Sequence, residues 1–284
     1  MKLKGKVAII TGASKGIGKC IAETFAREGC NLTIVSRHLE EISAAAEELK
    51  KYNVDVLPLK CDVSTPAEVE EMVKKTMGRF KKIDILVNNA GIYGPLGPLI
   101  DNDLELWAKT ININLMGTVM CTKFVFPHMM KARKGKIINF SGGGSGGPPT
   151  PTISAYATSK VAIVRFTEVV AEEVKDYNIQ VNSIAPGAVN TRLLDQVLEA
   201  ADRVDKKFLE KAKKQKETGG TPPEKAAQLV LYLASDDSDG ITGKLFSAVW
   251  DNYKDFSNKL DEIKRTPIYT LKRIDNILYK EVPK

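Results

Sequence analysis

A tyrosine and a lysine four residues apart are the side chains of this sequence best placed to move a proton. Tyr156 and Lys160 stand at the start of an apolar run with helical periodicity, Ser154 to Arg165. Residues at i and i+4 share one helix face, so the phenol and the ammonium can address the same spot. A phenol has an ordinary pKa of about 10, and a nearby cation favours its ionised form. The pair predicts a phenol that exchanges protons near neutral pH, although the same spacing also occurs on ordinary surface helices.

A glycine-rich stretch near the N-terminus indicates where an anionic ligand would bind. The apolar run Lys6 to Ile10 leads into TGASKGIG, and a helical pattern follows. Gly12 permits a tight turn, while Gly16 and Gly18 let the backbone and helix come close to a phosphate and to the sheet. A pyrophosphate can lie at the helix N-terminus, where free amides and the helix dipole favour an anion. This strand, loop and helix context predicts a dinucleotide site.

The residues after the second expected strand, Asn31 to Val35, favour one dinucleotide over the other. An acidic side chain there would bind the ribose 2′-hydroxyl of NAD. The sequence instead has Ser36 and Arg37, and Lys15 lies inside the glycine loop. Two cations could hold a 2′-phosphate, or they could simply be solvated loop residues. We expect NADP, with NAD less favoured.

Strand and helix patterns alternate along the chain and predict an α/β fold. Helices are expected at 40–51, 65–77, 103–130 and from Ser154, with Thr65 as the N-cap before Pro66. Further strands are expected at 54–59, 84–87, 136–140 and 179–184. Such alternation predicts a doubly wound parallel sheet, a Rossmann fold, covered by helices on both faces. We expect one dinucleotide-binding and catalytic domain, residues 1–250, and a C-terminal extension, residues 251–284.

Composition excludes several other classes of protein. The 284 residues are 43% hydrophobic and 27% charged, with a net charge of +7 and only short apolar runs. The basic residues are dispersed, which argues against nucleic-acid binding, and no run approaches membrane-spanning length. Four cysteines stand singly, without disulfide or metal-site spacing. We expect a cytoplasmic protein with no bound metal, no nucleic acid and no membrane partner.

Six short motifs follow one another along the chain: TGASKGIG, CDV at 61–63, NNAG at 88–91, NLMG at 114–117, YATSK at 156–160 and PGAVNT at 186–191. With these motifs in this order, the chain resembles the compact branch of the short-chain dehydrogenase/reductase family across residues 5–249. The resemblance implies an NADP-dependent oxidoreductase that transfers a hydride between the nicotinamide and a secondary alcohol or ketone. A dinucleotide-binding sensor or scaffold that has lost catalysis is the alternative.

The resemblance also implies roles for individual residues. Tyr156 would donate a proton to the carbonyl oxygen, Lys160 would hold the nicotinamide ribose, and Asn114 would fix a water that relays protons to Lys160. Asp62 would accept from the adenine amino group. The implied catalytic set is Asn114, Ser141, Tyr156 and Lys160. The implied cofactor-binding set is Gly12, Ser14, Lys15, Gly16, Ile17, Gly18, Ser36, Arg37, Asp62, Val63, Asn88, Ala90, Gly91, Tyr156, Lys160, Pro186, Gly187, Val189 and Thr191.

Outside the family pattern, some of these residues have simpler explanations. Asp62, Asn88 and Asn114 are then equally well explained as polar residues that form turns or bend a helix.

One motif departs from the family pattern. The family usually carries a catalytic serine about thirteen residues before the tyrosine, where this chain has Gly142 and Gly143. Ser141 is our candidate for the lost hydroxyl, Ser145 is a second, and a loop amide or a water is a third. Losing such a donor typically costs about a hundredfold or more in turnover.

The C-terminal third leaves the substrate and the assembly open. Residues 192–220 would cover the substrate as a helical lid with an apolar inner face that includes Leu193, Leu194 and Val197. The aromatic residues of the extension would pack on the same domain or on a neighbouring subunit. In this family the helices at 103–130 and after Ser154 commonly pair with their copies, so a homodimer or homotetramer is expected. A small alcohol or carbonyl compound is the expected substrate.

Overall fold

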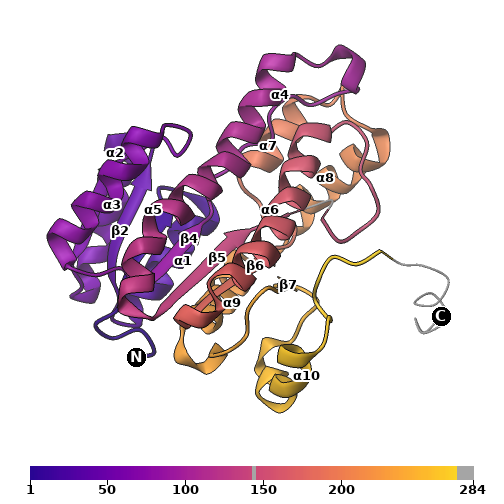
Figure 1. The fold of residues 1–284 in the computed structure, drawn as a ribbon. Coiled ribbons are helices and arrows are strands. Elements are labelled where there is room, and N and C mark those ends of the chain that lie inside the picture. The colour runs from indigo at the N-terminus through magenta and orange to yellow at the C-terminus, as the bar shows by residue number, and fades with distance from the viewer. Residues whose placement is uncertain (143–144, 274–284) are drawn as a thin grey trace.

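A seven-stranded parallel sheet forms the centre of the protein (Figure 1). The computed structural model describes residues 1–142 and 145–273. The strand order is β3-β2-β1-β4-β5-β6-β7, and every neighbouring pair is parallel. The strands are β1 (Val7–Thr11), β2 (Asn31–Ser36), β3 (Val56–Lys60), β4 (Ile85–Asn88), β5 (Gly135–Phe140), β6 (Ile179–Ala185) and β7 (Leu245–Ser247). The predicted doubly wound parallel sheet is confirmed.

Helices cover both faces of this sheet because its central strands are apolar on both sides. All five residues of β1 are buried, and successive residues point to opposite faces. One core contains Ile10 of β1, and the other contains Ile9. The first core is covered by α1 (Gly16–Arg27), α2 (Leu39–Leu49) and α9 (Pro223–Ala234), and the second by α3 (Pro66–Phe80), α5 (Gly117–Ala132) and α6 (Ser154–Glu173).

The helix expected over residues 103–130 is divided by a change in its hydrogen bonding. α4 (Leu104–Ile111) leads into a π-helical segment, Asn112–Met116, and then into α5. The side chain of Asp103 caps α4 by accepting from the amides of Glu105 and Leu106. Thr65 is the N-cap of α3 with Pro66 in the first turn, as expected, although the Thr65 side chain makes no capping bond.

Two further helices lie at the end of the molecule where the strands of the sheet end. α7 (Arg192–Glu199) and α8 (Lys206–Thr218) follow β6 and lie beside α4 and α6 in Figure 1. Their inner faces form a separate apolar cluster that includes Leu194, Val197 and Tyr156. This segment is therefore placed next to the side chains expected to do chemistry.

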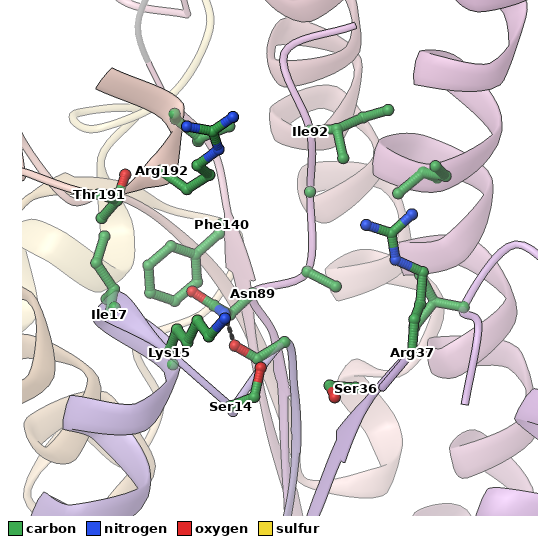
Figure 2. Close-up of a pocket in the computed structure, with 18 of the residues that line it drawn as sticks. Ser14, Lys15, Ile17, Ser36, Arg37, Asn89, Ile92, Phe140, Thr191 and Arg192 are labelled. Atoms are coloured by element: carbon green, nitrogen blue, oxygen red, sulfur yellow. Dashed lines mark hydrogen bonds between the residues drawn. The ribbon is translucent and has the colours of Figure 1, made fainter. Parts of the chain in front are cut away.

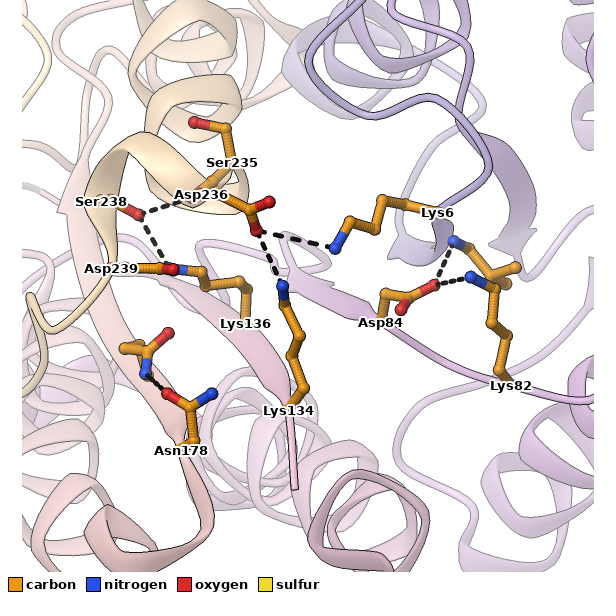
Figure 3. Close-up of polar contacts among 12 residues, drawn as sticks. Lys6, Lys82, Asp84, Lys134, Lys136, Asn178, Ser235, Asp236, Ser238 and Asp239 are labelled. Carbon is orange, nitrogen blue, oxygen red and sulfur yellow. Dashed lines mark hydrogen bonds and ion pairs between the residues drawn. The ribbon is translucent and has the colours of Figure 1, made fainter. Parts of the chain in front are cut away.

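The opposite end of the sheet is held by ion pairs (Figure 3). Lys136 of β5 is 4% exposed, and its ammonium lies 2.7 Å from a carboxylate oxygen of Asp239 and 3.1 Å from the Ser238 hydroxyl. Asp236 pairs with Lys134 at 3.1 Å and with Lys6 at 3.6 Å. A buried ammonium needs such partners, so these contacts fasten the turn after α9 to the sheet.

The described part of the C-terminal extension packs on the same chain. It contains a 3-10 segment, Tyr253–Lys259, and α10 (Leu260–Arg265). Phe256 is buried in the first core, where its ring centroid lies 4.8 Å from that of Phe246 in β7. Lys244 donates to the carbonyl oxygens of Thr266 and Ile268 at 2.6 and 3.1 Å. Tyr279, also expected to pack as part of the extension, lies outside the described residues.

None of the helices in the described part of the chain combines the length and apolar character that a membrane span requires.

Candidate active site

A cleft of about 690 Å³ opens at the carboxyl ends of the central strands. β1 is flanked by β2 and β4, so the strand order reverses there, and ligands of open α/β sheets bind at such a position. Figure 2 shows residues from the glycine loop, the end of β2, the end of β5 and the start of α7 around one space. Residues far apart in the sequence therefore contribute to a single site.

The glycine loop has the geometry that its sequence predicts. Gly12 and Gly16 have φ angles of +65° and +56°, where other residues are strained. A Cβ at Gly18 would meet the carbonyl oxygen of Gly12 and lie 2.6 Å from Nδ2 of Asn89. These glycines keep the turn tight and leave the first amides of α1 facing the cleft, where they can bind a phosphate.

Hydrogen bonds tie this turn to the NNAG segment. The Thr11 hydroxyl accepts from the amides of Asn89 and Ala90, both at 3.0 Å. The Asn89 side chain donates to the carbonyl oxygens of Thr11 and Gly12 at 2.9 and 3.1 Å. Asn89 thus shapes the cleft, although the sequence analysis assigned a role to Asn88 instead. The repeated asparagine in NNAG was the available signal.

The Asn88 side chain points into the protein rather than into the cleft. It is 4% exposed and donates to Oδ1 of Asn139 at 2.9 Å and to the Thr122 hydroxyl at 3.2 Å. These bonds join β4 to β5 and to α5. The contact of Asn88 with a cofactor stays a prediction.

The end of β2 presents a cation to the cleft. The Ser36 hydroxyl donates to the carbonyl oxygen of His38 at 2.9 Å and shapes the turn that exposes Arg37. Lys15 forms a 2.8 Å ion pair with Glu41. Since the Lys15 side chain is 72% exposed, this pair contributes little free energy, and a phosphate can displace the carboxylate.

Asp62 lies on the same side of the cleft with a carboxylate oxygen to spare. Its Oδ1 accepts from the amide and hydroxyl of Ser64 at 2.9 and 2.6 Å. Burial would raise the pKa of Asp62, but these bonds and the charges of Arg37 and Lys109 hold the pKa below its ordinary value. An ionised Asp62 can accept a hydrogen bond from an amino group.

Tyr156 and Lys160 lie together at the inner end of the cleft. They are 8% and 4% exposed, and the Lys160 ammonium lies 5.6 Å from the centre of the Tyr156 ring. The ammonium donates to the Phe140 carbonyl oxygen at 2.8 Å. An ammonium has three protons, so Lys160 keeps donors for further partners.

Burial dominates the protonation of this pair. It raises the pKa of the Tyr156 phenol above its ordinary value and lowers the pKa of the Lys160 ammonium to about 8. Lowering of the phenol pKa by Lys160 was expected from the sequence, but in this geometry burial outweighs the ammonium. At neutral pH the phenol is protonated, which suits a proton donor.

Asn114 is completely buried behind these two side chains. It lies in the π-helical segment, and such segments often mark functional sites. Its amide exchanges two hydrogen bonds with the backbone of Ile92, both at 2.9 Å, and donates to the Ser159 hydroxyl at 3.0 Å. A Cβ at Gly91 would lie 3.2 Å from Oδ1 of Asn114 and 3.5 Å from the Lys160 ammonium. Asn114 and Lys160 thus flank the same glycine.

The two candidate serines bond to each other. Ser141 Oγ lies 2.7 Å from Ser145 Oγ and 3.2 Å from the carbonyl oxygen of Lys160, and the Ser145 hydroxyl donates to the Gly142 carbonyl at 2.7 Å. Each hydroxyl has one proton, so both protons have partners within the protein. Ser141, unlike Ser145, is among the described residues that line the cleft.

The geometry at Gly142 explains why no serine stands at that position, next to the Tyr156 hydroxyl. A Cβ at Gly142 would lie 2.5 Å from the Tyr156 hydroxyl, so a side chain there would displace the phenol. Gly143 lies outside the described residues. The identity of the second donor stays a prediction.

Thr191 closes the cleft on the side of the glycine loop. Its methyl group would lie 3.3 Å from a Cβ at Gly16, so the two residues bracket the amides of α1. Arg192, which the sequence analysis did not assign, also lines the cleft and pairs with Glu199 through both guanidinium nitrogens.

The cleft brings together most of the residues assigned from the sequence. Those that line it are Gly12, Ser14, Lys15, Gly16, Ile17, Gly18, Ser36, Arg37, Asp62, Val63, Ala90, Gly91, Ser141, Tyr156, Lys160, Pro186 and Thr191. Asn88 and Asn114 are buried behind it, while Gly187 and Val189 lie in the segment between Pro186 and Thr191. No sequence signal marked Phe140, whose ring faces the cleft in Figure 2.

Comparison with known families identifies this arrangement. The family model described as short chain dehydrogenase matches residues 6–202. The chain belongs to the short-chain dehydrogenase family. Short-chain dehydrogenases are NAD(P)-dependent oxidoreductases, and this chain is therefore an enzyme of that class.

Two curated short-chain dehydrogenases match nearly their whole length. The (2S)-((R)-hydroxy(phenyl)methyl)succinyl-CoA dehydrogenase subunit BbsD of Thauera aromatica is 36% identical over 86% of this chain and 95% of its own. The 3-oxoacyl-(acyl-carrier-protein) reductase of Thermotoga maritima is 35% identical over 86% of this chain and 96% of its own.

Solved structures of the family have the same fold. An NAD⁺-bound xylitol dehydrogenase superposes with a TM-score of 0.80 at 31% identity and covers 87% of this chain and 98% of its own. A levodione reductase gives a TM-score of 0.79 at 28% identity, with 86% and 96% covered.

Proposed function

We propose that this short-chain dehydrogenase uses NADP to interconvert a ketone and a secondary alcohol. The observation that carries the proposal is the buried pair of Tyr156 and Lys160 at the inner end of the dinucleotide cleft. When bound, the nicotinamide supplies or accepts the hydride. The residues of this chain must then orient the substrate and hold or move its proton.

Tyr156 is the proton donor in the reducing direction. Its phenol is protonated at neutral pH because burial raises its pKa. Its hydroxyl lies against Gly142, so no side chain at that position blocks a substrate from the hydroxyl. Lys160, with its free donors, would hold the ribose and stabilise the phenolate that remains after proton transfer.

NADP is preferred because a cation, Arg37, and no carboxylate directly follows β2. Arg37 is exposed at the cleft and can bind a phosphate through two parallel hydrogen bonds. Lys15 adds a second positive charge once the phosphate replaces Glu41 as its partner. The first amides of α1 would bind the pyrophosphate, and Asp62 would accept from the adenine amino group.

The names of the relatives support carbonyl chemistry at a secondary carbon. One acts on a hydroxy(phenyl)methyl compound and another on a 3-oxoacyl group. By analogy, the substrate of this chain would carry its reacting oxygen on a carbon that is bonded to two other carbons.

The test is a panel of ketones, with the loss of NADPH absorbance as the readout. Saturable oxidation of NADPH with at least one ketone, and slower turnover with NADH, is the expected result. NADPH binding without turnover of any ketone or secondary alcohol would favour a sensor or scaffold instead. The paired serine hydroxyls are the one structural observation that favours this alternative.

A further inference from the structure

Tyr93 lies between the proton donor and the helices that cover the substrate. Its ring centroid is 4.4 Å from that of Tyr156, with 47° between the ring planes. The ring centroid of Phe208, on α8, lies 6.5 Å from that of Tyr93, and the two rings meet edge to face with 70° between their planes. Tyr93 therefore connects Tyr156 to α8 through aromatic contacts.

The backbone next to Tyr93 is fixed by Asn114. The Asn114 side chain accepts from the Ile92 amide and donates to the Ile92 carbonyl oxygen, both at 2.9 Å. Since Asn114 is itself completely buried, this double contact leaves the backbone little freedom. The position of the Tyr93 ring beside Tyr156 is thus built into the fold.

The surroundings of Tyr93 are apolar. Tyr93 packs against a cluster of apolar residues that also contains Leu96, Ile153, Leu194, Val197, Val204, Phe208 and Leu209. The Tyr93 hydroxyl makes no hydrogen bond with another described residue, and burial raises its pKa to about 12, so the ring is neutral. A charged group of a substrate would lose its hydration here without compensation.

We propose that Tyr93 determines substrate specificity by packing an aromatic substituent of the substrate against its ring and against Phe208. This inference rests on the proposed function, because the reacting oxygen must lie within hydrogen-bond reach of the Tyr156 hydroxyl. A substituent on the reacting carbon then lies beside Tyr93. Aromatic rings gain from offset and edge-to-face contacts beyond the area that they bury, and Tyr93 and Phe208 are both only partly buried, so part of each side chain stays open to a ligand.

The test compares two ketones that differ only in the ring. Phenylacetone and cyclohexylacetone have similar size and unconjugated carbonyl groups, so their intrinsic reactivities are similar. The dissociation constants of both ketones are measured by calorimetry for the protein with NADP⁺ bound, and kcat/KM is measured with NADPH. Unmodified protein is compared with Tyr93→Phe, Tyr93→Leu and Phe208→Leu.

The aromatic preference is the ratio of the two constants within each variant. We expect Tyr93→Leu to reduce this ratio about threefold to tenfold, as the loss of an aromatic contact predicts. Tyr93→Phe keeps the ring and should leave the ratio unchanged within about twofold. Phe208→Leu should reduce it in the same direction, and it replaces Tyr93→Leu if that variant does not fold.

Other results would overturn the inference. If the aromatic preference is the same in the unmodified protein and in the leucine variants, the role of Tyr93 is contradicted. This holds even where both ketones are reduced and the proposed function is correct. Failure of the complex with NADP⁺ to bind either ketone also contradicts it. Binding with an altered ratio but without turnover supports the role of Tyr93 and counts against the proposed reaction.

Discussion

At the scale of single residues, position in the cleft separates groups that their types do not distinguish. Tyr156 is buried and Tyr93 is partly buried, and their rings are in contact. Only Tyr156 shares a helix face with Lys160 and lies against Gly142. Lys15 and Arg37 are both cations beside the expected phosphate. Lys15 is already paired with Glu41, so Arg37 is the stronger candidate for selecting the cofactor.

Replacement of Arg37 by aspartate should reverse the cofactor preference. The change removes a phosphate-binding fork and adds repulsion. We expect the ratio of kcat/KM for NADPH over NADH to fall by about a hundredfold, the combined effect of a lost charge-assisted contact and a new like charge. Lys4→Asp makes the same charge change on an exposed residue away from the cleft and serves as the control. Tighter binding of NAD than NADP by the unmodified protein would refute the assignment.

The two serines should differ in their effect on turnover. Ser141 follows β5, its amide donates to the Ile184 carbonyl at 2.9 Å, and it lines the cleft. Because its backbone is fixed, the Ser141 hydroxyl needs only to turn its proton away from Ser145 to polarise a carbonyl. We propose that Ser141→Ala loses about a hundredfold in kcat, while Ser145→Ala loses only a few-fold. A larger loss at Ser145 would reverse the assignment, and small losses at both would leave the polarisation to a loop amide or a water.

At the scale of elements, the pattern of apolar residues was enough to predict the sheet and its helices. β1 was predicted at Lys6 to Ile10 and runs from Val7 to Thr11, because a buried strand must be apolar on both faces. The π-helical segment around Asn114 has no such pattern, since it differs from an α-helix only in its hydrogen bonds. The inward direction of Asn88 also depends on partners distant in sequence, Thr122 and Asn139.

Contacts made by tertiary packing also leave no local pattern in the sequence and could not be predicted from it. Tyr93 lies 63 positions before Tyr156, and no periodicity or motif links the two residues. The ring contact between them follows from the placement of β4 beside β5 and from the Asn114 contact with Ile92. Residues in the glycine loop, by contrast, were predictable because their function requires a local backbone geometry.

A comparison of two glycines tests the junction of β1 and α1. Gly18→Ala would place its Cβ against the Gly12 carbonyl oxygen and 2.6 Å from Nδ2 of Asn89. We expect NADPH affinity to fall by about tenfold or more and the free energy of unfolding to fall by about 1–3 kcal/mol, the usual range for overpacking.

Gly78→Ala, in α3, is the matched control. A Cβ at that position meets nothing within 4 Å, so this change should stabilise the helix slightly. Binding by fluorescence titration and unfolding in urea give the two readouts. Equal behaviour of the two variants would contradict the tight turn described here.

At the scale of the whole molecule, the described extension closes one edge of the sheet. The amide of Leu245 in β7 donates to the Tyr269 carbonyl at 2.7 Å, and Arg165 and Glu168 of α6 bond to the backbone of Leu271. Large apolar side chains are also exposed on the helices expected to pair. They include Leu106 in α4, Met116 in the π-helical segment, and Val161 and Val169 in α6, and are together called the exposed apolar face.

We propose that this exposed face pairs with its copy in a second subunit. Val164 and Val170 lie on α6, one of the two helices expected to pair, but both are buried in the subunit itself. We expect sedimentation at micromolar concentration to show a dimer or tetramer, and Val161→Glu combined with Val169→Glu to shift it towards monomer, since two charges would be buried at the contact. A monomer in the unmodified protein would contradict the proposal.

The replacement of Tyr156 by phenylalanine tests most directly whether this residue donates the proton. This change removes the proton donor and keeps the ring contact with Tyr93. With a ketone that the unmodified protein reduces, we predict a loss of about a hundredfold to ten-thousandfold in kcat, while the dissociation constant of NADPH stays within about threefold. Reduction of the ketone at more than about a tenth of the unmodified rate, with NADPH still bound, would show that another group donates the proton.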